Sequence, residues 1–413
     1  MLREVDVEGA AKRVAEVVDK TPLKLNQNLS EHYGANIFLK REDLQVVRSY
    51  KIRGAYNKIS SLGDKVKSKG VVCASAGNHG QGVAYACKLL GIKGIIFMPV
   101  PTPSQKVNQV NRYGGENVEL ILTGDTFDDA YSEAQNYCKE NNTTFVHPFN
   151  DLEVIAGQGT IGKEILEQAK EPIDVLILPV GGGGLASGIS SYFKEHSPHT
   201  KIIGVEPEGA PSMKKSMEAD KLVTLDHIDK FVDGAAVKVV GEITFDICKE
   251  NLAEVITVPE GHVCTTILKL YNEEAIVAEP AGVLSISALD FLKGEIKGKN
   301  IVCILSGGNN DIVRTEEIKE RSLLYEGLKH YFIVSFPQRA GALREFLVDV
   351  LGTDDDITYF QYSKKNHRER GPAVIGVQLK RKEDYKGLIQ RLEKLNFRYE
   401  YLNENPELFH HLI

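Results

Sequence analysis

The sequence predicts an α/β protein that carries a smaller α+β unit at its carboxyl end. From about residue 71 to residue 306, short Val- and Ile-rich runs alternate with helical stretches, as in parallel strands covered by helices. Near Arg321 the pattern changes to strand–helix–strand–strand–helix–strand, the order of a ferredoxin-like unit. At 413 residues the chain is too long for one compact core, so at least two domains are expected.

The strands expected in the first part are apolar on both faces and of ordinary strand length. They span residues 37–40, 71–74, 94–100, 118–122, 174–180, 201–206 and 300–305, with helices between them that include 126–140 and 185–194.

One further helix is expected to begin near Lys51, after the polar turn 41–43, with Ser49 as its N-cap. The helix dipole disfavours a cation at that end, so we expect the pKa of the Lys51 amine to be lowered. A lysine that acts as a nucleophile or base needs such a lowered pKa.

The second part has its own alternation of strands and helices. Strands are expected at 331–336, 357–362, 374–379 and 398–402, and helices at 341–351 and 384–395, after a linker at 313–329. We expect a first domain over residues 1–320, built of two α/β subdomains, and a second domain over residues 330–404.

Composition excludes several classes of function. A net charge of -7 without long runs of one sign gives no case for nucleic-acid binding. The six cysteines are scattered without C-x-x-C spacing, so buried free thiols are expected rather than metal ligands. The first residues are charged where a signal peptide would be apolar, and no apolar run approaches the ~20 residues of a membrane span. A cytoplasmic location is the expectation.

The first motif that indicates chemistry is the run 75–82, Ser-Ala-Gly-Asn-His-Gly-Gln-Gly, directly after the strand 71–74. Small residues at the start of a helix leave backbone N–H groups available, and Asn78 adds an amide, so an anion or a phenolate oxygen would suit this turn. A plain glycine-rich turn explains the run equally well, and His79 alone is more typical of packing.

The second motif is four consecutive glycines, Gly181 to Gly184, after the strand 174–180. Successive amides without side chains can close on phosphate oxygens, and the helix that follows adds its positive end. The competing interpretation is a dinucleotide site, since Gly181, Gly183 and Ala186 satisfy G-x-G-x-x-A and Glu206 follows about 20 residues later. The third motif, the turn Ser-Gly-Gly-Asn at 306–309, would by itself be only a turn.

Together with the run 49–55, Ser-Tyr-Lys-Ile-Arg-Gly-Ala, these motifs occur in one chain and in order. The combination resembles the tryptophan synthase β-like family of pyridoxal phosphate (PLP) enzymes, of fold type II, and within it the biosynthetic threonine dehydratases. The resemblance covers nearly the whole chain, and the carboxyl-terminal unit is similar to the ACT-like regulatory domain of those enzymes.

The resemblance implies a carbon–nitrogen lyase that converts L-threonine to 2-oxobutanoate and ammonia, the first committed step of isoleucine biosynthesis. Lys51 would hold PLP as a Schiff base and remove the α-proton. Asn78 would bind the ring hydroxyl, the backbone of the loop 181–185 would bind the phosphate, and Ser306 would meet the pyridine nitrogen. The cofactor-binding set implied is Lys51, Asn78, Gly181, Gly182, Gly183, Gly184, Leu185 and Ser306, with Ser75, Ala76, Gly77 and His79 near the substrate carboxylate.

The sequence does not decide the roles of two glutamates, Glu279 and Glu206. Glu279 would lie near the ring, although a capping or surface role explains it as well. Glu206 matches a cation-binding position of serine racemases, but the acidic ligand that follows there is replaced here by the run 208–212, so no metal is expected.

The resemblance further implies an effector site at the first strand-to-helix turn of the second unit. The candidate residues share that turn: Pro337, Gln338, Arg339, Gly341, Ala342 and Leu343. Isoleucine, with valine as a second candidate, is the implied effector, and a homotetramer or homodimer is the implied assembly. A role in assembly alone is the other reading of this unit.

Three alternatives remain: a serine dehydratase or serine racemase of the same fold, an NAD-dependent dehydrogenase built on the loop 181–186, and an inactive amino-acid sensor. The dehydrogenase leaves Lys51 and Asn78 unexplained, and an inactive sensor would be expected to have lost Lys51.

Overall fold

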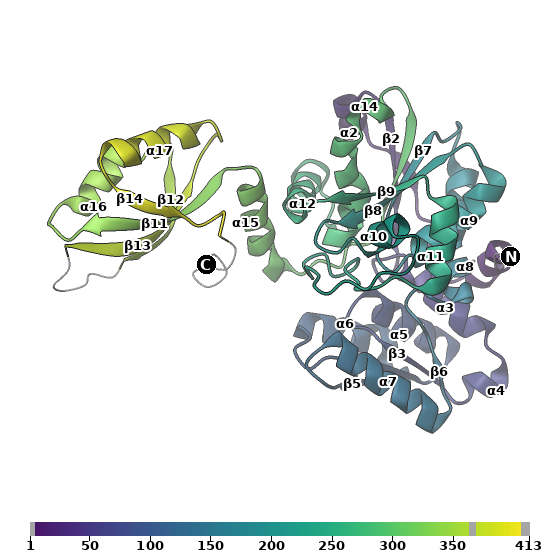
Figure 1. Ribbon diagram of the computed structural model, residues 1–413. Coiled ribbons are helices and arrows are strands. Elements are labelled where there is room, and N and C mark those ends of the chain that lie inside the picture. Colours follow the sequence, from purple (N-terminus) through teal and green to yellow (C-terminus); the bar gives the residue numbers. More distant parts are fainter. Residues whose placement is uncertain (1–4, 363–368, 406–413) are drawn as a thin grey trace. The chain divides into compact units, whose positions relative to one another are not determined.

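The computed structural model describes residues 5–362 and 369–405. The chain forms two compact units, Met1–Ile312 and Val313–Ile413, with two separate sheets in the first unit (Figure 1). Within the described ranges no helix is both long and apolar enough to cross a lipid bilayer.

The larger sheet of the first unit has six strands in the order β1-β2-β10-β7-β8-β9. Only β1 is antiparallel to its neighbour; the other pairs are parallel. Parallel strands bring their carboxyl ends to one edge, which is where binding sites form in such sheets. The strands are β1 (Leu23–Leu25), β2 (Asn36–Arg41), β7 (Val175–Pro179), β8 (Lys201–Pro207), β9 (Glu254–Val258) and β10 (Asn300–Leu305).

The smaller sheet, in the order β5-β4-β3-β6, is parallel throughout and is inserted in the chain between β2 and β7. Its strands are β3 (Val71–Ala74), β4 (Gly94–Met98), β5 (Val118–Leu122) and β6 (Thr144–Phe145). The strands expected in the first unit are confirmed to within one or two residues, whereas β1, β6 and β9 are not among them; β1 has three residues and β6 has two.

The helices of the first unit begin where local chemistry favours it. Thr126 and Asp129 form a capping box at the start of α7, and Asp151 caps α8. The helices are α1 (Val7–Val14), α2 (Gln27–Tyr33), α3 (Lys51–Ser61), α4 (Asp64–Lys67), α5 (Asn78–Leu90), α6 (Ser104–Gly114), α7 (Phe127–Asn141), α8 (Leu152–Gln168), α9 (Gly184–His196), α10 (Ser212–Glu218), α11 (Glu242–Asn251), α12 (Glu260–Glu274), α13 (Leu284–Ser287) and α14 (Lys293–Ile296).

The second unit is a four-stranded antiparallel sheet in the order β12-β13-β11-β14, the ferredoxin-like arrangement that the sequence predicts. Its strands and helices are β11 (Lys329–Pro337), α16 (Ala342–Glu345), β12 (Asp356–Tyr362), β13 (Arg370–Gln378), α17 (Asp384–Lys394) and β14 (Arg398–Tyr401). The helix expected at 341–351 is α16 followed by a π-helical turn, Phe346–Val350, and the stretch expected as a linker contains the helix α15 (Thr315–Tyr325). The predicted fold class is confirmed.

All six cysteines are free thiols, and all except the half-buried Cys138 are buried. Their burial agrees with the sequence expectation.

Candidate active site at the carboxyl ends of the parallel strands

The three predicted motifs and the start of α3 meet at one edge of the sheets. The turn after β10 pairs with the segment that leads into α3: the N–H of Tyr50 donates to the carbonyl of Ser306 at 3.2 Å, and Ser49 forms a β-bridge with Gly307. This backbone pairing places Lys51, the first residue of α3, directly beside the turn at Ser306.

The predicted N-cap role of Ser49 is wrong. Tyr50 occupies the cap position without a side-chain hydrogen bond, and the hydroxyl of Ser49 is buried without a partner among the described residues. The reason is tertiary, because the backbone of Ser49 is already paired with the turn after β10 and so lies outside the first turn of the helix.

Lys51 Nζ donates a hydrogen bond to the carbonyl of Pro148 at 3.0 Å. Burial lowers the pKa of the Lys51 amine to about 8, while the negative charge of Glu279 acts in the opposite direction. The expected direction is confirmed, but desolvation is the largest cause rather than the helix dipole on which the expectation was based. A substantial fraction of Lys51 is therefore neutral near pH 8.

The four glycines form a turn that only glycine can make. Gly183 has φ of 90°, and a Cβ on Gly182 would lie 2.2 Å from the Phe149 ring. No described residue accepts a hydrogen bond from the backbone N–H groups of 181–185, although Gly182, Gly183, Gly184 and Leu185 are buried. Unsatisfied donors at the start of α9 are the requirement for binding a phosphate group.

Glu279 is buried, which excludes a surface role, and it precedes the short helical turn Pro280–Val283 without a side-chain capping hydrogen bond. Its Oε1 accepts a hydrogen bond from Asn78 Nδ2 at 2.6 Å. Burial, followed by the charge of Asp233, raises the pKa of Glu279 to about 7. Ser306, directly after β10, is 2% exposed, and its hydroxyl donates a long 3.4 Å hydrogen bond to the carbonyl of Ala281.

The residues at the start of α5 differ in exposure and in their hydrogen bonds. Ser75 Oγ accepts the N–H of Gly77 at 3.2 Å, and Ala76, Gly77 and Asn78 are partly exposed. His79 is 3% exposed, and its Nε2 lies 2.8 Å from the carbonyl of Val146. Burial and the charge of Lys51 lower the pKa of His79 to about 3, so the ring is neutral and Nε2 donates to this carbonyl.

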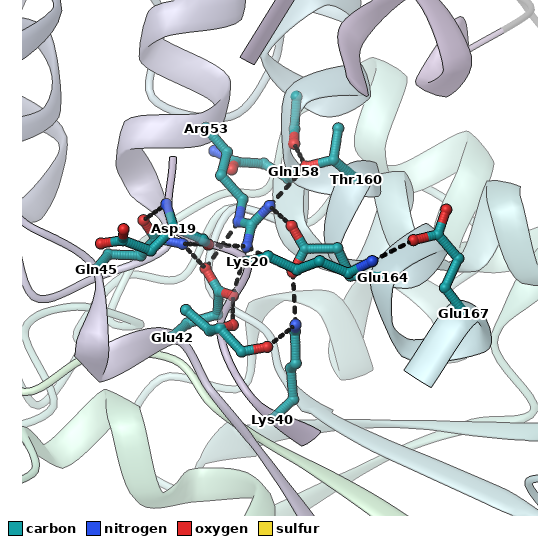
Figure 2. A network of polar contacts seen from close by, with 12 residues as sticks. Asp19, Lys20, Lys40, Glu42, Gln45, Arg53, Gln158, Thr160, Glu164 and Glu167 are labelled. Carbon is teal, nitrogen blue, oxygen red and sulfur yellow. Dashed lines mark hydrogen bonds and ion pairs between the residues drawn. The ribbon is translucent and has the colours of Figure 1, made fainter. Parts of the chain in front are cut away.

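A buried ion network holds α3 from the side opposite Lys51 (Figure 2). Arg53, two residues along the helix and so turned by about 200°, is fully buried. Its guanidinium makes paired hydrogen bonds to Glu42 at 2.8 Å each and to Glu164 at 2.6 and 3.0 Å. Glu164 also accepts from Lys40 Nζ at 2.5 Å, so two cations balance two carboxylates. Glu42, expected in a polar turn, is thus a buried anchor.

In the second unit the turn after β11 borders a cavity of about 490 Å³. Phe360 and Tyr362 of β12 and Leu347 contribute apolar walls. All six effector-site candidates line it: Pro337, Gln338, Arg339, Gly341, Ala342 and Leu343.

Comparison with known proteins places this geometry in a family. The family of pyridoxal-phosphate dependent enzymes matches residues 14–307, and the C-terminal regulatory domain of threonine dehydratase matches residues 320–412. The biosynthetic L-threonine dehydratase of Halalkalibacterium halodurans is 58% identical over 408 residues, which cover 99% of this chain and 98% of that protein.

The chain belongs to the threonine dehydratase family of PLP-dependent enzymes. The biosynthetic L-threonine dehydratase of Bacillus subtilis is likewise 58% identical, over 98% of this chain and 96% of that protein. Among solved structures, the processed form of threonine deaminase isoform 2 from Solanum lycopersicum has a TM-score of 0.74 at 41% identity, covering 78% of this chain and 87% of that one. Maize serine racemase has a TM-score of 0.72 at 32% identity, covering 79% and 99%.

The residues present fit the cofactor of this family. The loop 181–185 offers unsatisfied N–H donors without side chains in the way, and Lys51 is a partly neutral amine at the same edge of the sheets. Asn78 adds a side-chain amide, and Ser306 adds a hydroxyl. Phosphate, carbonyl, ring hydroxyl and ring nitrogen thus each have a chemically suitable counterpart.

Glu206 does not suit the role that a dinucleotide site requires. It is fully buried, and its two carboxylate oxygens accept the N–H groups of Met213 at 2.7 Å and Lys214 at 2.8 Å, at the start of α10. Its oxygens are therefore committed to the helix rather than exposed to a ribose hydroxyl.

The segment after β6 takes part in the site, although no role for it was expected from the sequence. Pro148 supplies the carbonyl that holds Lys51, and Phe149 packs over the glycine loop. Thr244 Oγ1 donates to the carbonyl of Gly182 at 2.6 Å and fixes the same loop from α11. A His-Pro-Phe-Asn run after a very short strand was the only signal, and no residue in it is typical of PLP chemistry.

Proposed function

We propose that this protein is a PLP-dependent threonine ammonia-lyase, which converts L-threonine to 2-oxobutanoate and ammonia. The observation that carries the proposal is the juxtaposition of Lys51, with its lowered pKa, and the unsatisfied amides of the loop 181–185 at one edge of parallel strands. The high identity to the biosynthetic dehydratases over almost the whole chain supports threonine as the substrate.

In this proposal the chain's own residues hold PLP at both ends. The N–H groups of 181–185 bind the phosphate, with the positive end of α9 behind them. Asn78 would donate to the ring hydroxyl oxygen, Ser306 would face the pyridine nitrogen, and Lys51 would hold the carbonyl carbon until the substrate amine replaces it and frees the Lys51 amine. When bound, PLP withdraws electrons from the substrate's Cα and so makes its proton acidic.

Lys51 is the group that we assign to proton transfer. Its amine takes the proton from Cα as a general base, which requires the neutral form that burial favours. Loss of the β-hydroxyl as water and later addition of water at Cα release ammonia, so the overall change is threonine to 2-oxobutanoate plus ammonia. Ser306 offers a hydroxyl rather than a carboxylate, so it would leave the ring nitrogen of bound PLP largely unprotonated, which would favour elimination over transamination.

Binding of the substrate carboxylate is assigned to Ser75, Ala76 and Gly77 at the start of α5. Ala76 and Gly77 are partly exposed, whereas Ser75 is buried beside them; this exposure and the donors of a helix N-terminus support the assignment. His79, buried and bonded to Val146, supports the segment that carries Pro148 instead of meeting the substrate.

Regulation is assigned to the second unit. Its cavity of about 490 Å³ has apolar walls beside Arg339, whose guanidinium is paired with Glu345, and apolar walls beside a cation suit a branched apolar amino acid. We propose isoleucine as the effector, with valine as the second candidate, in a homotetramer or homodimer. The cytoplasm is the compartment we propose, on the composition arguments above.

The test measures 2-oxobutanoate release from L-threonine by the purified protein with PLP, with Lys51→Ala as the matched inactive control. Turnover that isoleucine suppresses supports both the lyase activity and the effector site. Turnover that neither isoleucine nor valine changes refutes the effector site alone. A preference for L-serine, or racemisation of serine, would favour the serine-specific relatives. Absence of PLP binding would refute the proposal as a whole.

A further inference from the structure

Three side chains beside the candidate active site form one continuous hydrogen-bonded chain. Asn309 Nδ2 donates to the main-chain carbonyl of Val47 at 2.8 Å and to Asn78 Oδ1 at 2.7 Å. Asn78 Nδ2 in turn donates to Glu279 Oε1 at 2.6 Å. The chain joins the turn after β10, the first residue of α5 and the segment 276–279.

The direction of donation along these hydrogen bonds follows from the bond between Asn309 and Val47. A main-chain carbonyl can only accept, so the atom of Asn309 that faces Val47 must be its nitrogen. The same nitrogen faces Asn78, which must therefore present its oxygen there and direct its own nitrogen to the Glu279 carboxyl. An asparagine amide is otherwise ambiguous between two orientations, and here one backbone carbonyl removes the ambiguity.

One hydrogen of Asn78 remains. Each amide nitrogen carries two hydrogens, and Asn309 uses both, while Asn78 uses one on Glu279. Among the described residues no further partner of Asn78 Nδ2 is found, and Asn78 Oδ1 already accepts a hydrogen bond from Asn309. Asn78 Nδ2 therefore keeps one hydrogen that it can donate to the site.

Glu279 is held firmly enough to act as the end of this chain. Its N–H donates to the carbonyl of Gly307 at 3.2 Å, and its carboxyl also accepts the backbone N–H of Asn309. A Cβ on Gly307 would lie 2.1 Å from Glu279 Oε1, so the carboxyl fills the space that this glycine leaves. Moving Asn309 would thus disturb both neighbours of Asn78.

We infer that Asn309 and Glu279 are positioning residues that force the Asn78 amide to act as a donor to the ring hydroxyl oxygen of PLP. The inference rests on the proposed function, because it takes Asn78 as the partner of that oxygen. It assigns roles to two residues beyond the set that would touch the cofactor's ring hydroxyl, carbonyl and phosphate.

The deciding measurement is the PLP dissociation constant of the apoprotein, together with its melting temperature without PLP. Asn309→Asp keeps the side-chain size but cannot donate to Val47, so the amide of Asn78 is free to turn its oxygen toward the site. We expect PLP to bind roughly 10- to 100-fold more weakly. The hydrogen bond from Asn78 to the ring hydroxyl oxygen would be lost, and two oxygen atoms would face each other in its place. Glu279→Gln keeps an acceptor for Asn78 and should stay within about threefold of the wild type. The same Asn-to-Asp exchange at the exposed Asn141 of α7 is the matched control.

A double variant distinguishes positioning from general support. If Asn309 acts through Asn78, then Asn309→Asp adds little once Asn78 is Ala, and the double variant binds PLP as weakly as Asn78→Ala alone. Additive losses would overturn the inference, as would a lowered melting temperature of the Asn309→Asp apoprotein with unchanged PLP affinity.

If Asn309→Asp does not fold, Glu279→Met provides the same cycle with Asn78→Ala and decides the question. If the wild type binds PLP and Asn309→Asp binds it with the same affinity, this inference is overturned and the proposed function is left intact. Wild-type protein that fails to bind PLP refutes the proposed function, and this inference with it.

Discussion

Replacing Arg53 by Met should strongly destabilise the first unit. Arg53 lies only two residues from the proposed catalytic lysine, but it faces away from it, so the effect is expected on stability. The change removes a fully buried cation and leaves Glu42 and Glu164 facing only Lys40, so this group of two cations and two carboxylates, drawn within Figure 2, becomes net negative. Removing one partner of a buried ion pair typically costs about 3–5 kcal/mol.

The magnitude can be converted to a melting temperature. A unit that ends at residue 312 has an unfolding entropy of about 0.65 kcal/mol/K, from the usual value of about 2.1 cal/mol/K per residue. A loss of about 3–5 kcal/mol therefore lowers the melting temperature by roughly 5–8 °C. Differential scanning calorimetry of the apoprotein measures the shift, and the signal of the second unit serves as an internal reference.

The controls use the same network. Lys20→Met breaks the exposed pair with Glu167 and should shift the melting temperature by less than about 1–2 °C. Adding Glu42→Gln to Arg53→Met removes the unpaired carboxylate and should recover part of the loss. Burial by itself would raise the pKa of Glu42, but Arg53 outweighs it and the pKa is lowered. The difference in melting temperature between wild type and Arg53→Met should therefore narrow as pH falls and Glu42 takes up a proton. A drop below 1 °C, or no recovery in the double variant, would refute the reasoning.

Three further predictions concern the glycine loop, a buried carboxyl and the effector cavity. Gly183→Ala forces a side chain onto φ of 90° and 2.8 Å from Thr244, so equilibrium dialysis should show PLP binding weakened about tenfold or more, while Gly294→Ala, in open space, changes nothing. Burial raises the pKa of Glu206 to about 7, so its stabilising protonated form is lost as pH rises through 7. The melting temperature of Glu206→Gln relative to wild type should therefore increase between pH 5 and pH 8, and an equal difference at both would contradict this. Phe360→Ala should raise the isoleucine concentration for half-inhibition about tenfold, with turnover in its absence within twofold of wild type.

Much of the fold follows from the sequence, because strand and helix patterns are local properties. The Val- and Ile-rich strands, the ferredoxin-like order of the second unit and the loop after β7 are all legible from residue type and spacing. The short strands β1 and β6 are not, because two or three residues carry no periodicity and are strands only through their neighbours β2 and β3.

The motifs of the candidate site are local as well. Lys51, Asn78, the glycines 181–184 and Ser306 each follow a strand or open a helix, and the carboxyl ends of parallel strands bring them to one edge. Sequence alone therefore supplied the family, the cofactor and the residues that we propose to hold it.

Tertiary structure alone decided the environment of those residues. The backbone of Ser49 pairs with Gly307 instead of capping α3, and burial rather than the helix dipole lowers the pKa of Lys51. Glu279 became a buried partner of Asn78 because segments 201 residues apart meet at the site. Desolvation and hydrogen-bond partners depend on what surrounds a group in three dimensions, and no pattern along the chain specifies them.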